Sequence, residues 1–182
     1  MRPSGYLAGF NDTFNCKDLT ISGKAQALPT SVSQSSTYVY TETGDIKKAE
    51  NAIDGDLKTF AHTKCAWDTD VWYKMKFDAV YCFSDVVIIN SKLNEYANRM
   101  DEAKVLVINT ETGAESLCGV LKVTDVMTIE GQTYRIPCDL KCGDEVKVTL
   151  RHDKDKYRHE ACIHMNEISA FHKGFYFDLL IV

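Results

Sequence analysis

Apolar and polar residues alternate along this chain in short runs, and this pattern constrains the fold more than any other feature. In residues 72–77, the side chains of Tyr73, Met75 and Phe77 would face one way and the two lysines the other. Comparable apolar runs occupy residues 85–90, 105–108, 146–150 and 163–171. Turn residues separate the runs, and no long amphipathic helix intervenes. The pattern predicts an all-β sandwich of antiparallel strands.

The segments between these runs are predicted to be loops and turns. Residues 28–45 are rich in Ser, Thr and Gly, and we expect a short helical turn over residues 45–52. The alternating charges of residues 153–156 indicate a solvated hairpin tip. The sequence predicts an N-terminal extension at 1–18, one domain at 19–171 and a C-terminal tail at 172–182.

Size and charge exclude several classes of protein. A chain of 182 residues can bury the core of one domain. Its formal net charge of −5 argues against binding to nucleic acid. No apolar run approaches the roughly 18 residues needed to span a bilayer, so no transmembrane segment is predicted.

The cysteines are numerous for this length: Cys16, Cys65, Cys82, Cys118, Cys138, Cys142 and Cys162. They are either a disulfide framework in an oxidising compartment or zinc ligands and reduced thiols. Disulfides are favoured, because the one short spacing, Cys138 to Cys142, has no matching second pair. The odd number leaves at least one cysteine without a partner in the chain. The sequon Asn11-Asp12-Thr13 agrees with a secreted or extracellular protein.

Motifs for catalysis are absent from the sequence. It contains no Gly-x-Ser-x-Gly elbow, phosphate loop, dinucleotide fingerprint or His-Glu-x-x-His. Residues 159–164 mix metal-ligand types, but on a strand His159 and His164 would point to opposite faces. Surface histidines are the expected alternative. We therefore expect a binding module and not an enzyme.

Several stretches of the sequence resemble a known family when taken in order: Ser33–Tyr38, Asn51–Asp56, Thr59–Cys65, Val71–Phe77, then Arg99, Cys118, Tyr134, Cys138 and Asn166–Ile168. Together they are similar to the discoidin domain and, within it, to the F-type lectin (fucolectin) family. The resemblance covers roughly residues 19–171. It implies a discoidin-like (jelly-roll) β-sandwich.

The family binds fucose on loops at one end of the sandwich, through a histidine and two basic residues. Here Arg99 matches the basic motif unchanged, whereas Lys92 replaces Arg and Asn94 replaces Asp. Trp67 falls at the histidine position, and His62 could reach the same rim. Because Lys lacks the bidentate fork of Arg, strict fucose specificity is not expected. The structural alternative is that Trp67 is a core aromatic and the two cations are solvated.

The resemblance implies an extracellular carbohydrate-binding module for recognition or adhesion, with a fucose-lectin-like site. Its partners would be glycans or cell-surface glycoproteins, and the chain is compatible with an oligomer. The alternative is a discoidin-type module that binds protein or phospholipid surfaces and has lost the fucose site.

The family also has a structural calcium site, and four residues match its positions: Asn51, Asp54, Asp56 and Glu167. Their hard oxygen atoms are the ligands that Ca²⁺ prefers. Lys64 falls where the family has a ligating serine, and its cation would oppose a metal. The alternative is that Asp54 only caps its own turn.

Two disulfides belong to the family pattern. Cys118 and Cys138 match one pair. Cys65 matches the first partner of the other, whereas the expected position in the last strand falls four residues after Cys162. This displacement leaves two alternatives for Cys162, namely Cys65 and Cys142.

Overall fold

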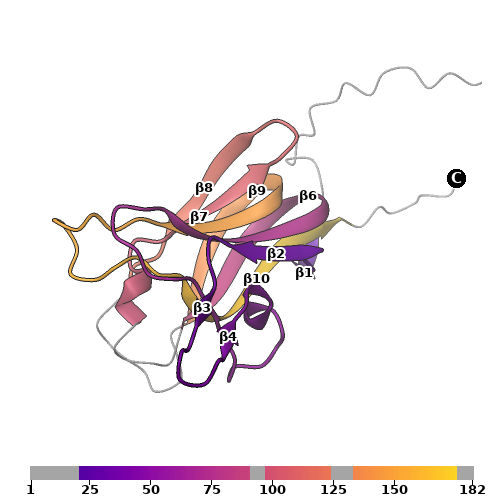
Figure 1. Ribbon diagram of the computed structural model, residues 1–182. Helices are drawn as coiled ribbons and strands as arrows, with labels where there is room; N and C mark the ends of the chain where they lie inside the picture. Colours follow the sequence, from indigo (N-terminus) through magenta and orange to yellow (C-terminus); the bar gives the residue numbers. More distant parts are fainter. Residues whose placement is uncertain (1–20, 91–96, 124–132, 176–182) are drawn as a thin grey trace, which may run out of the picture.

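The chain folds almost entirely into antiparallel β-strands (Figure 1). The computed structural model describes residues 21–90, 97–123 and 133–175. The strands are β1 (Ile21–Ala27), β2 (Ser31–Gln34), β3 (Tyr38–Val39), β4 (Ile46–Lys47), β5 (Ala61–His62), β6 (Val71–Asn90), β7 (Lys104–Asn109), β8 (Ala114–Val120), β9 (Thr133–Leu150) and β10 (His164–Phe175). Two short 3-10 turns, η2 (Ala49–Ala52) and η3 (Ala97–Met100), are the helical elements of these ranges. No helix there is long and apolar enough to cross a membrane.

β6 and β9 are the two longest strands, and both contribute to the two layers of the sandwich. Residues 71–76 of β6 pair with residues 145–150 of β9, and β2 lies on the other side. Residues 81–89 pair with residues 133–143 of β9, and here β10 is the other neighbour. The register breaks between these halves, where both strands curve (Figure 1). The predicted fold class, an antiparallel β-sandwich, is confirmed.

The core lies between the layers and follows the predicted alternation. Tyr73, Met75 and Phe77 are buried, while Lys76 between them is exposed. Other buried core residues of β6, β7 and β9 are Phe83, Val86, Ile88, Val105, Val107, Val146 and Val148. Full burial of one such side chain stabilises a fold by about 1.5–3 kcal/mol. The sandwich is therefore held mainly by the inward faces of β6, β7 and β9.

The loops that follow or precede the long strands gather at one end of the sandwich, which we call the loop end. Val71 pairs with Leu150, and Asn90 pairs with Met165, so both ends of β6 lie there. The loop after β5 contacts the loop after β9, because the Asp68 amide donates to the His152 carbonyl. The loop end is at the left and bottom of Figure 1, opposite the curve of β6 and β9.

Three disulfides join the six cysteines of the described residues: Cys65–Cys162, Cys82–Cys142 and Cys118–Cys138. The alternative pairing of Cys142 with Cys162 was wrong. Cys142 lies directly opposite Cys82 in the β6–β9 register, so these two sulfur atoms meet. Cys16 and the sequon at Asn11 lie outside the described residues.

Cys162 reaches Cys65 because it precedes the last strand instead of lying on it. Ala66 and Ala161 form a two-residue antiparallel bridge, which brings the neighbouring cysteines together with their Cα atoms 4.6 Å apart. The displacement along β10 that argued against this pair therefore does not apply, since β10 begins at His164.

Three expected elements differ from the structure. The segment predicted as loop, residues 28–45, contains β2, whose backbone pairs with residues 73–76 of β6, and also the two-residue strand β3. Within β2, Val32 packs against the core, and none of the four residues is fully buried. The other three residues can therefore be polar. The helical turn is the shorter η2, and the last strand continues past residue 171 to Phe175.

Replacing Cys118 and Cys138 together by Ser should lower the free energy of unfolding by about 3.3 kcal/mol, from the entropy of a 20-residue loop. The same change at Cys65 and Cys162 should cost more, about 4.7 kcal/mol, because 97 residues separate them. Urea denaturation of the two double variants measures both. Equal losses would contradict the loop-entropy account, and thiol labelling of the unreduced protein checks that each pair exists.

Candidate functional site

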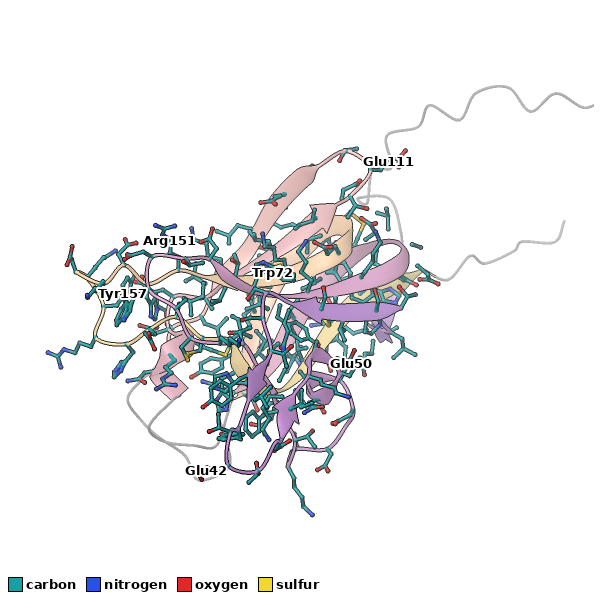
Figure 2. All side chains as sticks on the ribbon, viewed as in Figure 1. Glu42, Glu50, Trp72, Glu111, Arg151 and Tyr157 are labelled. Carbon is teal, nitrogen blue, oxygen red and sulfur yellow. A yellow bond between two sulfur atoms is a disulfide. The ribbon has the colours of Figure 1, made fainter. Side chains whose placement is uncertain are left out.

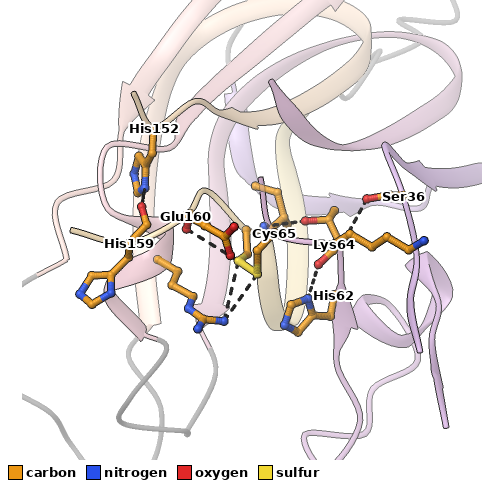
Figure 3. Close-up of a disulfide and its surroundings, with 11 residues drawn as sticks. Ser36, His62, Lys64, Cys65, His152, His159 and Glu160 are labelled. Carbon is orange, nitrogen blue, oxygen red and sulfur yellow. Dashed lines mark hydrogen bonds between the residues drawn. A yellow bond between two sulfur atoms is a disulfide. The ribbon is translucent and has the colours of Figure 1, made fainter. Parts of the chain in front are cut away.

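Arg99 lies against the Cys65–Cys162 disulfide at the loop end. Its Nη1 atom is 3.5 Å from the Cys65 sulfur and 3.9 Å from the Cys162 sulfur. The η3 turn carries Arg99, and the next residue, Met100, is fully buried and fixes that turn to the core. Figure 3 shows the disulfide with Lys64 and Glu160 beside it. The local fold therefore holds one guanidinium at a defined place on the surface.

A groove of about 620 Å³ opens beside this disulfide, and we call it the first groove. Its lining residues are Thr37, Tyr38, Val39, Thr41, Lys64, Cys65, Arg99 and Glu160. They combine two cations, one carboxylate and three hydroxyls with an aromatic ring and a sulfur atom. Such a mixture can hydrogen-bond a polyhydroxylated ligand and pack against its apolar C–H surface.

An aromatic layer supports the wall of the first groove from below. The ring of Tyr38 stacks on His62, with the ring centroids 4.7 Å apart, and His62 contacts His164 at 4.6 Å. His62 and His164 are both buried. The ammonium group of Lys47 lies over the Phe60 ring at 4.0 Å. This layer fixes Tyr38 before any ligand arrives.

Burial lowers the pKa of both histidines. The pKa of His62 falls to about 4, because burial outweighs its contact with the Thr63 carbonyl and because Arg99 and Lys47 add positive charge. The pKa of His164 falls to about 3, again first through burial and then through His62 and the same two cations. Both rings are therefore neutral at physiological pH, and neither provides a cation to the groove.

The predicted sugar-binding residues are only partly brought together. Arg99 lines the first groove, whereas His62 lies beneath Tyr38 and is not part of the lining. Trp67 is half-buried and also does not line it. Lys92 and Asn94 lie outside the described residues. Of the three members of this set that the structure describes, Arg99 alone lines the groove.

Sequence reasoning missed every residue of the lining except Arg99, among them Tyr38, Lys64 and Glu160. Tyr38 was in a motif that carried the family resemblance, but the motif gave no indication of which way its ring points. The expectation of surface histidines was wrong for His164, which is buried, and holds for His159, which is exposed.

The four predicted calcium ligands lie on or beside one loop, between η2 and β5. Three oxygen atoms converge on the hydroxyl of Thr59: the Asn51 carbonyl at 3.2 Å, Asp54 Oδ2 at 2.8 Å and the Asp56 carbonyl at 2.9 Å. One hydroxyl has a single proton for three acceptors. The donor set is therefore rich in hard oxygen and fits a cation such as Ca²⁺.

Glu167 reaches this loop from β10. Its Oε1 atom accepts the Gly55 amide at 2.7 Å. Burial raises the pKa of the Glu167 carboxyl; the Gly55 bond opposes the rise, and the negative charges of Asp54 and Asp56 add to it. A bound cation would relieve this concentration of negative charge.

The turn also has partners of its own, as the structural alternative predicted. Asp54 Oδ1 accepts the Asp56 amide at 2.8 Å, which is the hydrogen bond of a self-capping turn. Within the described ranges, no three His, Cys, Asp or Glu side chains are grouped as metal ligands. A cation here would therefore depend on backbone carbonyls. Lys64, at the position of the family's ligating serine, lines the first groove. The hydroxyl at the calcium loop belongs to Thr59.

Solved structures of sugar-binding proteins share this fold. A fucolectin from striped bass (Morone saxatilis) serum has a TM-score of 0.61 at 17% identity, over 80% of this chain and 46% of that chain. The SpX-3 fucose-binding module of Streptococcus pneumoniae has a TM-score of 0.61 at 16% identity, over 81% and 97%. The family 32 carbohydrate-binding module of C. perfringens NanJ, in complex with galactose, has a TM-score of 0.54 at 16% identity, over 78% and 92%.

Comparisons with protein-family models and with curated protein sequences find no match. The structural similarity is nevertheless extensive, and the expected resemblance is confirmed at the level of fold. The chain has the discoidin-like fold of F-type lectins and of family 32 carbohydrate-binding modules. It spans less than half the length of the bass fucolectin, and it spans nearly all of the bacterial modules.

Acid should destabilise the fold in a window set by the buried histidines. Between pH 6.5 and about 4, the unfolded chain binds protons at His62 and His164 that the folded chain does not, so stability falls as the pH falls. The slope should be at most about 1.4 kcal/mol per pH unit for each histidine. Urea denaturation at pH 6.5, 5.5 and 4.5 measures it.

The control is the His164→Gln variant, which removes one of the two titrating groups. Its slope over the same pH range should be about half that of the wild type. Carboxylates whose pKa is lowered, such as Asp85 and Asp144, act at lower pH and do not produce this slope. Equal slopes in the two proteins would show that the buried histidines do not cause the acid sensitivity.

Proposed function

We propose that this chain is an extracellular carbohydrate-binding module, without catalytic activity, that recognises glycans in the first groove. The observation that supports this most is the placement of Arg99 against the Cys65–Cys162 disulfide, beside an aromatic ring fixed from below. The fold neighbours named above include proteins that bind fucose and galactose, which gives the proposal independent support.

The chemistry of the groove accounts for sugar binding in simple terms. The guanidinium of Arg99 donates charge-assisted hydrogen bonds to ring or hydroxyl oxygen atoms. Thr37 and Thr41 offer hydroxyls that can donate and accept. The Tyr38 ring and the disulfide offer apolar surface for the C–H face of a pyranose. Glu160 supplies an acceptor for sugar hydroxyls that must donate.

The proposed specificity is for glycans that include fucose, without strict selection of fucose. Arg99 is the cation retained from the fucose motif, whereas Lys92 and Asn94 depart from it. A lysine forms weaker and less directional hydrogen bonds than the arginine fork. The groove would therefore accept neutral sugars with comparable vicinal hydroxyls, such as galactose.

The cysteines support an extracellular location. All six in the described ranges are in disulfides, and such frameworks persist in oxidising compartments. Glycans or cell-surface glycoproteins are the partners that this location offers.

A second candidate function is binding to a protein or phospholipid surface. It is favoured by one observation: Val39 and Ile46 pair across β3 and β4 and are 43% and 46% exposed. Apolar side chains presented together beside a groove are typical of interaction surfaces. Co-sedimentation with phosphatidylserine vesicles that is lost in Val39→Ser would favour this function over the first.

Replacing Arg99 by Ala should weaken glycan binding by roughly 10- to 100-fold, because each charge-assisted hydrogen bond contributes about 1.5–3 kcal/mol. A glycan array followed by titration calorimetry on the best-bound glycan measures this. The Arg99→Lys variant keeps the charge and should recover only part of the affinity. The proposal fails if wild-type protein binds no glycan, or if Arg99→Ala retains full affinity while remaining folded.

We also propose that Ca²⁺ binds the loop of Asn51, Asp54 and Asp56, with Glu167 as a further ligand. The convergence of three oxygen atoms near Thr59 and the raised pKa of Glu167 support it. Calcium would brace the loop and would take no part in chemistry.

Calcium at a hundredfold excess over its dissociation constant should add about 2.7 kcal/mol of stability, and EDTA should remove it. Thermal denaturation with and without each reagent measures the change. The Asp54→Asn variant should lose the calcium-dependent part of the shift. A Tm of the wild-type protein that calcium leaves unchanged would contradict the site.

A further inference from the structure

One wall of the first groove is formed by the hairpin of β3 and β4, residues 38–47, which we call the wall hairpin. Within the described residues it is a two-stranded sheet of its own and pairs with no strand of the eight-stranded sheet. Its turn, which carries Glu42, lies at the bottom of Figure 2, apart from Trp72 of the large sheet. Half of the groove lining lies on the wall hairpin or next to it: Thr37, Tyr38, Val39 and Thr41. Because a lone hairpin is only marginally stable in water, the shape of the groove depends on what holds this one against the sandwich.

The residue that the wall hairpin buries is a cation. Lys47 is 8% exposed and is the only buried residue of the hairpin, whereas Val39 and Ile46, which pair across it, are both exposed. This is the reverse of the usual pattern, since lysine is rarely buried unless its charge has a partner. Simple patterning would place the two apolar side chains inside. The inversion indicates that a specific contact of Lys47, and not hydrophobic burial, holds the hairpin.

The ammonium group of Lys47 contacts two aromatic rings and one carboxylate. It lies 4.0 Å from the centre of the Phe60 ring and 5.4 Å from that of the Tyr40 ring. It also donates a hydrogen bond to Asp45 Oδ2 at 2.5 Å. Contacts between a cation and an aromatic face are strongest where water is excluded, as it is around this buried group. The contact with Phe60 therefore joins the wall hairpin to the segment that enters β5.

This contact acts next to the ring that faces the groove. Tyr38 lies directly opposite Lys47 in the hairpin, and its ring stacks on His62, two residues after Phe60. Each strand of the hairpin thus makes one contact with the same short segment. The Gln34 side chain of β2 also donates to the Lys47 carbonyl at 2.8 Å, and this bond would survive any change of the side chain. The ammonium contact is therefore the part of the attachment that substitution can remove selectively.

We propose that Lys47 is a positioning residue of the first groove, which docks the wall hairpin on the Phe60 ring and thereby sets how readily a ligand binds. Lys47 is not part of the groove lining, so it acts through Tyr38 and its neighbours on the hairpin. A wall that is already in place lowers the entropic cost of binding. This inference rests on the proposed function, because it assumes that the first groove binds a sugar.

The Lys47→Met variant tests the role of the charge, since it keeps a long side chain and removes the ammonium group. If the hairpin is docked for a smaller fraction of the time, the apparent affinity falls by that fraction. We expect binding of the best-bound glycan of an array to weaken roughly 3- to 10-fold, through slower association at an unchanged dissociation rate. NMR line-shape analysis of a titration measures both rate constants. Lys47→Arg keeps a cation for the Phe60 face and should recover most of the affinity.

Hydrogen exchange tests the docking without any ligand. The amides of Tyr40 and Gly44 are hydrogen-bonded within the wall hairpin, to the carbonyls of Asp45 and Tyr40. Their exchange should be faster in Lys47→Met than in the wild type, because the hairpin opens more often. The amide of Thr63, which bonds to the Ile163 carbonyl outside the hairpin, should exchange at the same rate in both proteins.

The outcomes separate this inference from the proposed function. Lys48→Met is the matched control, since it removes an exposed cation from the next position and should change neither rate constant. Three results would overturn the positioning role and leave the first groove in place: unchanged affinity or hairpin exchange in Lys47→Met, a loss caused by faster dissociation, or Lys47→Arg binding no tighter than Lys47→Met. Absence of binding to every glycan by the wild type would overturn the proposed function and this inference with it. Near-UV circular dichroism checks that each variant is folded.

Discussion

The covalent link between Cys65 and Cys162 is the constraint on which the loop end depends. It joins the segment after β5 to the segment before β10, and the Ala66–Ala161 bridge sets the two chains at the right spacing. Arg99 then packs against the sulfur atoms. The disulfide thus adds a covalent link to the backbone hydrogen bonds between the two loops, and it gives the Arg99 side chain a fixed surface at the side of the first groove.

The rest of the sandwich serves to make that point of contact rigid. Because β6 and β9 pass through both layers, both of their ends arrive at the loop end. The described loops there connect paired strands, and the aromatic layer of Tyr38, His62 and His164 lies behind them. Binding residues on loops that a rigid scaffold positions are a common arrangement. The two buried neutral histidines have a cost, since they make the same region sensitive to acid.

Much of the fold could be predicted from the sequence, because burial on a strand has a period of two residues. The alternation through Tyr73, Met75 and Phe77 gave the correct inward face. β2 was missed because three of its four residues are polar, so it has no apolar alternation in the sequence. The Cys82–Cys142 pair was also missed, since it depends on the register of two distant strands. Register of that kind is not encoded in any local motif.

Less of the candidate site could be predicted, because site geometry depends on side-chain direction. Arg99 was found through a motif, and the structure places it in the groove. Tyr38 and Glu160 were not found, since no local pattern indicates that they face the same groove. His62 shows the reverse error: its residue type favoured a role in binding, whereas the fold buries it under Tyr38.

The most direct test of the account is an NMR titration of the isotopically labelled protein with the glycan that it binds best on an array. The account predicts saturable chemical-shift changes in the backbone amides of Tyr38, Lys64, Cys65 and Arg99, with one dissociation constant for all four. Amides at the opposite end, such as that of Val80, should not move. Saturable changes confined to the opposite end, or no saturable change at all, would contradict the claim that the loop end of this sandwich is a carbohydrate-binding site.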